Sequence, residues 1–378
     1  MIQSIEILPM KSRENGLTLR LQIKNWLIKE FVKYQLDDKL PTNRALAKQL
    51  NVSLVTVHNA MNELCREGYV IRRQGKGTFL SSWERQVINE ANGNTKNGRI
   101  IIACPNYFSA EYWNRISDSE ELAVKNGFGL VEFKMNRDTR YENILEMAGA
   151  QENLRAIFIV PVPGTFTRKI FNKFDAIGIP VFVFEACPFV SLGRNVISIT
   201  PDWFKAEYIQ MKYLLDNGHR SIASIINEPL MMELPLSLKG KRQALLDYGL
   251  SPRSLIKTDK TPQPWENSAE FAYEATGRML KKHSVTALIY SSSSGALAGI
   301  RKLRELNLRV PEDISIITTG GHLVIDENSP PPLTVVSTDH FKEVEMAFDI
   351  ITGRAKLMSK SILSEPELIV RESVRRIG

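Results

Sequence analysis

The chain has 378 residues, of which 43% are hydrophobic and 24% are charged, with a formal net charge of +7. This length predicts two or three folded units, and the composition is that of a globular protein, which excludes a disordered or fibrous chain. Three cysteines, Cys65, Cys104 and Cys187, are odd in number and far apart, so they predict neither a disulfide framework nor a metal site.

The first residues, MIQSIEILPMKSRENG, contain Glu6 inside their apolar stretch and no small-residue cleavage site, so a secretory signal is not predicted. No run of about 18 apolar residues could cross a bilayer. We therefore expect a cytoplasmic protein without membrane association. Its charge is uneven: residues 1–82 hold 13 Lys or Arg against 7 Asp or Glu, whereas residues 83–378 hold 36 against 35. A basic first fifth is typical of a domain that contacts phosphates, and a solubilising surface is the alternative.

Residues 17–34 place apolar side chains at helical spacing, which predicts a first amphipathic helix. Thr42 is suited to cap a second helix, and a short turn at Asn51 and Val52 leads to a third helix that begins near Ser53. Two β-prone runs, YVIRR and TFLSS, flank the turn QGKG and predict a hairpin. This order predicts a winged helix-turn-helix over residues 1–82.

The stretch LPTNRALAKQLNVSLVTVHNAMNELCREGYVIRRQGKGTFL, residues 40–80, resembles the winged-helix head of GntR-family transcription regulators in helix, turn and wing. The resemblance implies binding of a double-stranded DNA operator, with the third helix in the major groove and the second helix and wing on phosphates or the minor groove. The DNA-binding residues that we expect are Thr42, Arg44, Ser53, Leu54, Thr56, Val57, His58, Arg73, Gly75, Lys76, Gly77 and Thr78. Relatives commonly carry arginine at the positions of Leu54 and His58, so a different reading of the operator is implied.

Residues 89–98, NEANGNTKNG, lack apolar periodicity, and we expect a linker over residues 83–98. Beyond it, short apolar strands alternate with helical stretches over residues 99–378, which predicts parallel sheets in two α/β lobes joined around residues 190–225. The predicted strands are IIIACP, FGLVEF, AIFIVPV, PVFVFEA, SIASII, TALIYS and ISIITT.

Residues 99–378 resemble the ligand-sensing domain of the lactose and galactose repressor family, which is periplasmic-binding-protein-like. Matching motifs occur in order, among them GIPV at 178–181, GHRSI at 218–222, GKRQAL at 240–245, VPEDIS at 310–315 and LIVRES at 368–373. A GntR-type head on such a body is the arrangement of the arabinose repressor and its relatives. The resemblance implies a small-molecule effector, which is a carbohydrate in many relatives, and a homodimer on a pseudo-palindromic operator.

In open α/β sheets, ligands bind beyond the carboxyl ends of the strands, so we expect effector-binding side chains there. This rule nominates Phe108, Trp113, Glu185, Ser293 and His322, and the resemblance implies two further candidates, Ser237 and Trp265. Trp265 is a candidate for stacking on a ligand, and a packing role is equally consistent with the sequence.

Three polar anchors of the sugar-binding relatives are replaced. Ser237 stands where those relatives have an arginine, Ser293 where they have an aspartate, and Gly320 with Gly321 where they have an acidic pair. Charge-assisted hydrogen bonds carry much of the specificity of such pockets. Three alternatives therefore remain for the pocket: it binds a sugar by other contacts, it binds a less polar ligand, or it binds no ligand.

Other classes of function find less support. No Walker loop, GxSxG or HExxH motif occurs, and the histidines lack metal-ligand spacing, so we expect no enzyme, no metal site and no cofactor. A solute-binding transport protein has no use for a basic helix-turn-helix. We therefore predict a transcription regulator, most simply a repressor released by its effector, with a ligand-independent DNA-binding protein whose body only dimerises as the alternative.

Overall fold

The computed structural model describes residues 23–24, 26–27, 30–31, 34, 38–66, 70–73, 76–80, 96–107, 109–230, 238–320 and 323–377. The chain divides into two compact units, Met1–Lys96 and Asn97–Gly378. All but the last three residues of the expected linker, 83–98, lie outside the described residues. Among the helices described, none combines the length and apolar character needed to span a bilayer.

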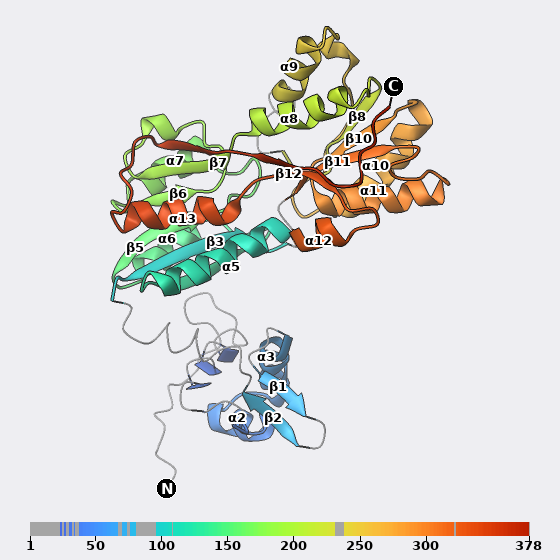
Figure 1. The fold of residues 1–378 in the computed structure, drawn as a ribbon. Coiled ribbons are helices and arrows are strands. Elements are labelled where there is room, and N and C mark those ends of the chain that lie inside the picture. The colour runs from blue at the N-terminus through green and yellow to red at the C-terminus, as the bar shows by residue number, and fades with distance from the viewer. Residues whose placement is uncertain are drawn as a thin grey trace. The chain divides into compact units, whose positions relative to one another are not determined.

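The N-terminal unit contains α2 (Asn43–Leu50), α3 (Leu54–Arg66) and a hairpin of β1 (Val70–Arg73) and β2 (Gly77–Leu80) (Figure 1). Thr42 caps α2, because its Oγ1 accepts a hydrogen bond from the Ala45 amide at 3.2 Å. Asn51 then adopts a left-handed conformation, with φ at 52°, which turns the chain sharply into α3. The predicted helix-turn-helix and wing are confirmed.

A small core holds this unit together. Ile23, Leu27 and Phe31 are buried at helical spacing before α2, and they join apolar residues of α2, α3 and both hairpin strands in one cluster. The backbone of residues 38–40 extends the hairpin, because the amides of Leu40 and Leu80 bond to the carbonyls of Thr78 and Asp38 at 2.9 and 3.1 Å. The wing is therefore fixed against the start of α2.

The C-terminal unit contains two six-stranded sheets flanked by helices (Figure 1). The first sheet has the order β13-β7-β6-β5-β3-β4, and all of its pairs are parallel. Its strands are β3 (Arg99–Pro105), β4 (Gly129–Met135), β5 (Leu154–Ile159), β6 (Val181–Val183), β7 (Val196–Pro201) and β13 (Ser361–Ser364). Four helices cover its two faces: α5 (Ala110–Lys125) and α13 (His340–Ile351) pack on one, and α6 (Tyr141–Gly149) and α7 (Arg168–Asp175) on the other.

The second sheet has the order β14-β12-β11-β10-β8-β9, in which only the β14–β12 pair is antiparallel. Its strands are β8 (Ile222–Ile225), β9 (Ile256–Lys257), β10 (Ala287–Tyr290), β11 (Ser315–Gly320), β12 (Thr334–Ser337) and β14 (Glu367–Ile369). The helices of this lobe are α8 (Trp203–Asp216), α9 (Lys239–Asp247), α10 (Ser268–Lys282), α11 (Ser293–Glu305) and α12 (Leu323–Asn328), with 3₁₀ turns at Pro252–Ser254 here and at Val190–Leu192 in the first lobe.

The chain passes between the sheets three times. It leaves the first sheet between β7 and α8, returns between β12 and α13, and leaves again between β13 and β14. The two-lobed parallel fold predicted from the sequence is confirmed, and all seven predicted strands are present. The expectation that the lobes are joined around residues 190–225 covers only the first passage, because the other two lie near residues 338 and 366.

Candidate functional site

The start of α3 is built around a hydroxyl cap. The Ser53 Oγ accepts a hydrogen bond from the Thr56 amide at 3.1 Å, and it lies 2.6 Å from the Thr56 Oγ1. Both hydroxyls expected to contact bases are therefore engaged with each other and with the first turn of the helix.

One residue expected to contact DNA is misplaced. Val57 is 0% exposed and packs in the core of the N-terminal unit, so it cannot reach a base edge. The exposed apolar side chains at this end of α3 are those of Val55 and Leu54, which are 68% and 45% exposed. Helical geometry separates the two sides: residues 57, 61 and 64 fall on the core stripe, and residues 54, 55 and 58 fall opposite.

His58 is tied to the start of α2. The Asn43 side-chain amide lies 3.2 Å from the His58 Nδ1. When the Asn43 amide donates to Nδ1, the neutral ring carries its proton on Nε2 and presents that N–H as a donor. Asn43 therefore orients a side chain that sequence analysis had expected to read bases.

A surface groove of about 560 Å³ brings together many of the expected DNA-facing residues. It is lined by Thr42, Arg44, Leu54, His58, Gly77 and Thr78, together with Lys39, Leu40, Pro41, Asn43 and Val55. Ser53, Thr56, Arg73 and Lys76 lie outside its lining, and Gly75 lies outside the described residues. The second helix, the third helix and the wing thus meet at one surface that carries exposed Arg44.

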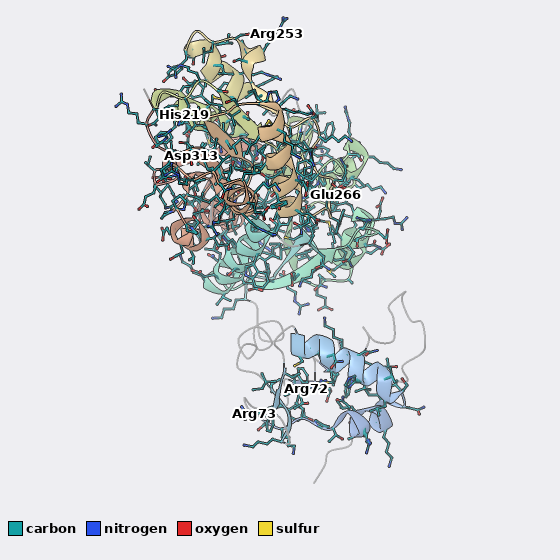
Figure 2. All side chains as sticks on the ribbon, turned by 90° about the vertical axis from the view of Figure 1, so that its right-hand side faces the viewer. Arg72, Arg73, His219, Arg253, Glu266 and Asp313 are labelled. Atoms are coloured by element: carbon teal, nitrogen blue, oxygen red, sulfur yellow. The ribbon has the colours of Figure 1, made fainter. Side chains whose placement is uncertain are left out.

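The two arginines of the wing strand β1, labelled in Figure 2, make different contacts. Arg72 donates a hydrogen bond to the Asn62 Oδ1 of α3 at 2.6 Å, and the Arg73 guanidinium lies 4.6 Å from the centre of the Phe79 ring. Adjacent residues of a strand point to opposite faces, so only one of the pair can bridge to α3. Arg73 and Lys76 are both exposed at the wing surface.

The C-terminal unit holds a cavity of about 1050 Å³ at the carboxyl ends of its parallel strands. Its lining comes from the segments that follow strands of both sheets, including Tyr107 after β3, Glu185 after β6, Glu228 after β8 and Ser291 after β10. Parallel strands bring these ends to one edge, which explains why residues far apart in sequence meet there.

Three of the expected effector residues, Glu185, Trp265 and Ser293, line this cavity. Trp113 does not: it is 70% exposed on α5, and its neighbour Tyr112 lines the cavity instead. Successive residues of a helix differ by about 100° in direction, so a placement wrong by one residue points a side chain elsewhere. Phe108, Ser237 and His322 lie outside the described residues.

Aromatic side chains form one wall. The Tyr107 ring makes edge-to-face contacts with Tyr112 and Trp265 at centroid distances of 5.4 and 5.5 Å, and the two tyrosine hydroxyls lie 3.0 Å apart. Trp265 has φ at 68°, a left-handed conformation that is costly for a bulky residue. Sequence analysis missed both tyrosines, although Tyr107 lies just beyond the carboxyl end of β3, where ligand-binding residues were expected.

The Glu185 carboxylate is held on the first lobe. Its Oε1 accepts hydrogen bonds from the Ala186 amide at 2.9 Å, from the Trp203 Nε1 at 3.2 Å and from the Thr200 Oγ1 at 3.4 Å. These donors come from the ends of β6 and β7 and from the start of α8. The carboxylate is thereby oriented before any ligand arrives.

On the second lobe, Ser293 is only 7% exposed, and its Oγ has no hydrogen-bond partner among the described residues. A Cβ atom placed on Gly320 would lie 3.1 Å from this Oγ and 2.7 Å from the Asp326 Oδ2. The buried carboxylate of Asp326, on α12, therefore lies beside Gly320, where the resemblance implied the loss of an acidic pair. Sequence analysis did not find it, because it follows Gly320 by six residues.

A buried ion pair closes another side of the cavity. The Lys241 Nζ lies 3.4 Å from the Glu207 Oε1, and both side chains line the cavity. Burial raises the pKa of Glu207, while Lys241 opposes this rise. The adjoining Gly240 is required by close packing, because a Cβ there would lie 2.0 Å from the Phe204 carbonyl oxygen.

A second buried cluster lies at the passage from β12 to α13. The Arg115 Nη1 lies 2.9 Å from the Glu343 Oε2, and the Arg115 Nη2 lies 2.8 Å from the His340 Nδ1. Ser364, at the end of β13, donates to the Glu343 Oε1 at 2.6 Å. Burial favours a raised pKa for Glu343, but Arg115, His340 and Ser364 together lower it to about 2, so the carboxylate is charged.

The His340 Nδ1 lies 3.4 Å from the Glu343 Oε2 as well as 2.8 Å from the Arg115 Nη2, and its Nε2 faces the Thr338 Oγ1 at 3.3 Å. His340 also lines the cavity. The cluster therefore connects the cavity wall with two of the three passages between the sheets. Across the described part of the chain, no group of three or more His, Cys, Asp or Glu residues is placed to hold a metal ion.

His219 is structural rather than part of either site. It is 0% exposed, with its Nδ1 2.9 Å from the Thr286 Oγ1 and its Nε2 3.1 Å from the Arg375 carbonyl oxygen (Figure 2). Burial lowers its pKa, which favours the neutral ring. It fastens the segment after α8 to the C-terminal segment.

Two family models match the chain: bacterial regulatory proteins of the gntR family over residues 18–80, and a periplasmic binding protein-like domain over residues 211–374. The chain is 25% identical over 356 residues to the arabinose metabolism transcriptional repressor of Halalkalibacterium halodurans, covering 89% of this chain and 90% of that protein. It is also 25% identical over 348 residues to the transcriptional repressor PurR of Histophilus somni, covering 89% and 100% respectively.

Solved structures of LacI family regulators share the fold of the body. The regulator from Weissella paramesenteroides with bound sucrose has a TM-score of 0.61 at 20% identity, over 74% of this chain and all of that chain. The regulator from Enterococcus faecium with bound ribose has a TM-score of 0.61 at 19% identity, with the same coverage.

Proposed function

We propose, from the premise that this chain joins a GntR-type helix-turn-helix domain to a periplasmic-binding-protein-like domain, that it is a transcription repressor whose affinity for operator DNA is controlled by a small molecule. The observation that carries the proposal is the cavity of about 1050 Å³ between the two lobes of a body attached to a DNA-binding head. A drug-sized or sugar-sized molecule fits such a volume.

The head supplies the contact with DNA. The groove that unites α2, α3 and the wing carries Arg44, and Arg73 and Lys76 are exposed on the wing. Cations at these places position a protein on phosphates, whereas the start of α3 enters the major groove. The concentration of basic residues in the first 82 residues supports the same assignment.

The cavity supplies the effector site, and its chemistry favours a carbohydrate or a related metabolite. Tyr107 and Trp265 offer apolar faces, while Glu185 and Ser293 offer an oriented acceptor and a buried hydroxyl. Sugars are bound by this combination of ring stacking and directed hydrogen bonds. The sugars named with the related structures are consistent with this class.

Control of DNA binding follows from the three passages between the lobes. A ligand that contacts both lobes favours one degree of lobe closure. In a dimer, closure of the two bodies changes how the two DNA-binding heads, one from each protomer, are presented to the operator. A hundredfold change in operator affinity requires about 2.7 kcal/mol of coupling free energy. Ser293 from the second lobe and Glu185 from the first lobe are the kind of opposed contacts that can supply it.

The proposal includes a homodimer in the cytoplasm and no catalytic activity. Two helices that border the cavity also expose large apolar side chains, Trp113 on α5 at 70% and Val324 on α12 at 74%. Exposed apolar side chains of this size favour an interface with a second copy. A dimer matches a pseudo-palindromic operator.

The test uses the full chain. An operator is first selected from random duplex DNA, and its affinity is then measured by fluorescence anisotropy with and without pentoses, hexoses, disaccharides, sugar acids, polyols and nucleosides. We expect one class of compound both to raise the melting temperature of the body and to weaken operator binding. If no compound stabilises the body or changes operator affinity, the alternative, a ligand-independent DNA-binding protein whose body only dimerises, replaces this proposal.

A further inference from the structure

The outer surface at the start of α3 is apolar. Leu54 and Val55 are 45% and 68% exposed, although they stand at the end of the helix that enters the groove of DNA in this class of domain. Single exposed apolar residues are ordinary on protein surfaces. Two in succession at a reading position need a partner that accepts apolar contact.

The polar groups nearest to this pair are already engaged. The Ser53 and Thr56 hydroxyls lie 2.6 Å apart, and the Ser53 Oγ accepts the Thr56 amide proton. The first turn of α3 therefore presents two aliphatic side chains outward, while the Ser53 and Thr56 hydroxyls form the hydrogen bonds that cap the helix.

The same surface carries several of the residues that we expect to contact DNA. Leu54 and Val55 line the groove that also contains Arg44, His58 and Thr78. A cation of α2 and a residue of the wing flank the apolar pair, and groups of this kind grip the backbone on either side of a base-reading element.

The major groove offers one apolar group, the 5-methyl group of thymine, and aliphatic side chains contact it in sequence-specific complexes. We propose that Leu54 and Val55 read thymine methyl groups, so that each half-site of the operator carries thymine at the base pairs that face the start of α3. The inference rests on the proposed DNA-binding function and adds its base specificity. His58, held by Asn43, contributes one donor beside this apolar contact.

The experiment compares two versions of an operator selected by the full-length protein. In the second version, deoxyuridine replaces thymidine in both half-sites, which removes the methyl groups and keeps the base pairing. We expect the affinity to fall about fourfold for each contacted methyl group. The double variant Leu54→Ala/Val55→Ala is expected to bind both versions equally. Both side chains are exposed, so the variant keeps its core.

The matched control is Leu246→Ala, which removes a leucine that is 52% exposed in the body and is expected to keep the full preference for thymine. A third variant, Leu54→Arg, is expected to shift the selected sequence toward guanine at the facing base pair. Equal binding of the two operator versions by the parent protein overturns the inference and leaves the DNA-binding function standing. A parent that selects no DNA sequence overturns both.

Discussion

Replacing Glu343 with glutamine tests the buried cluster that connects the cavity wall with the passages between the lobes. Glu343 is 0% exposed and Arg115 is 1% exposed, with 2.9 Å between the Arg115 Nη1 and the Glu343 Oε2. Removing the carboxylate leaves a buried guanidinium without its counter-charge, which costs about 3–5 kcal/mol. In a body of this size, the melting temperature should fall by on the order of 10 °C.

The pH dependence of stability gives an independent measure of what the Glu343 carboxylate contributes to the free energy of unfolding. The pKa of Glu343 falls from 4.5 to about 2 on folding, which corresponds to about 3 kcal/mol of stability at neutral pH. Because the pKa is lowered, this contribution is complete above the ordinary pKa of 4.5 and is lost as the pH falls toward 2. The parent protein should therefore lose stability over this range more steeply than the Glu343→Gln variant.

Calorimetry of the full-length protein from pH 7 down to pH 3 measures both effects in the transition of the body. The control is Glu365→Gln, because Glu365 forms an ion pair with Lys205 while 74% exposed, and an exposed pair contributes at most about 1 kcal/mol. A Glu343→Gln variant that melts like this control would refute the reasoning.

Three further predictions concern the two sites. Trp265→Ala should abolish the stabilisation of the body by ligand and leave operator affinity intact, which calorimetry with ligand and anisotropy with operator DNA measure. Trp113→Ala should retain stabilisation by ligand and weaken the dimer, which analytical ultracentrifugation measures. Arg44→Ala and Lys76→Ala should each lower the slope of log affinity against log salt by roughly one for each phosphate that the variant no longer binds, and unchanged slopes would contradict their placement on DNA. Val57→Ala should destabilise the head by roughly 2 kcal/mol in urea unfolding without changing the selected sequence, and a changed sequence would argue against its burial.

Most of the fold could be predicted because buried parallel strands are continuous apolar runs. Strand β7 was missed because Ser198 and Thr200 interrupt its run. Both are nonetheless buried, since the Ser198 hydroxyl donates to the Glu185 carbonyl at 2.7 Å and the Thr200 hydroxyl donates to the Glu185 carboxylate. A polar residue becomes a core residue when a distant segment supplies its partner, and a local pattern does not contain that partner.

The candidate site was predictable from strand ends for Glu185, after β6, and for Ser293, after β10, whereas Trp265 was predicted from the family resemblance. Within helices the prediction needed an accuracy of one residue, and it chose Trp113 where Tyr112 faces the cavity and Val57 where Val55 is exposed. Asp326 was beyond reach, because α12 brings it back toward Gly320 and no spacing rule encodes that return. Sequence periodicity defines a face, and the direction of an individual side chain depends on where its helix begins.

The three passages between the sheets have a consequence for synthesis on the ribosome. The first sheet lacks its edge strand β13 until Ser364 has emerged, although β7 is complete at Pro201. At 5–20 residues per second, this interval lasts roughly 8 to 30 s. Meanwhile α13 cannot yet cover the face where Ile100, Ile102 and Phe158 later contact Phe348 and its neighbours. The first lobe, although begun first, is completed only after most of the second, so the nascent chain exposes an apolar sheet face that chaperones can bind.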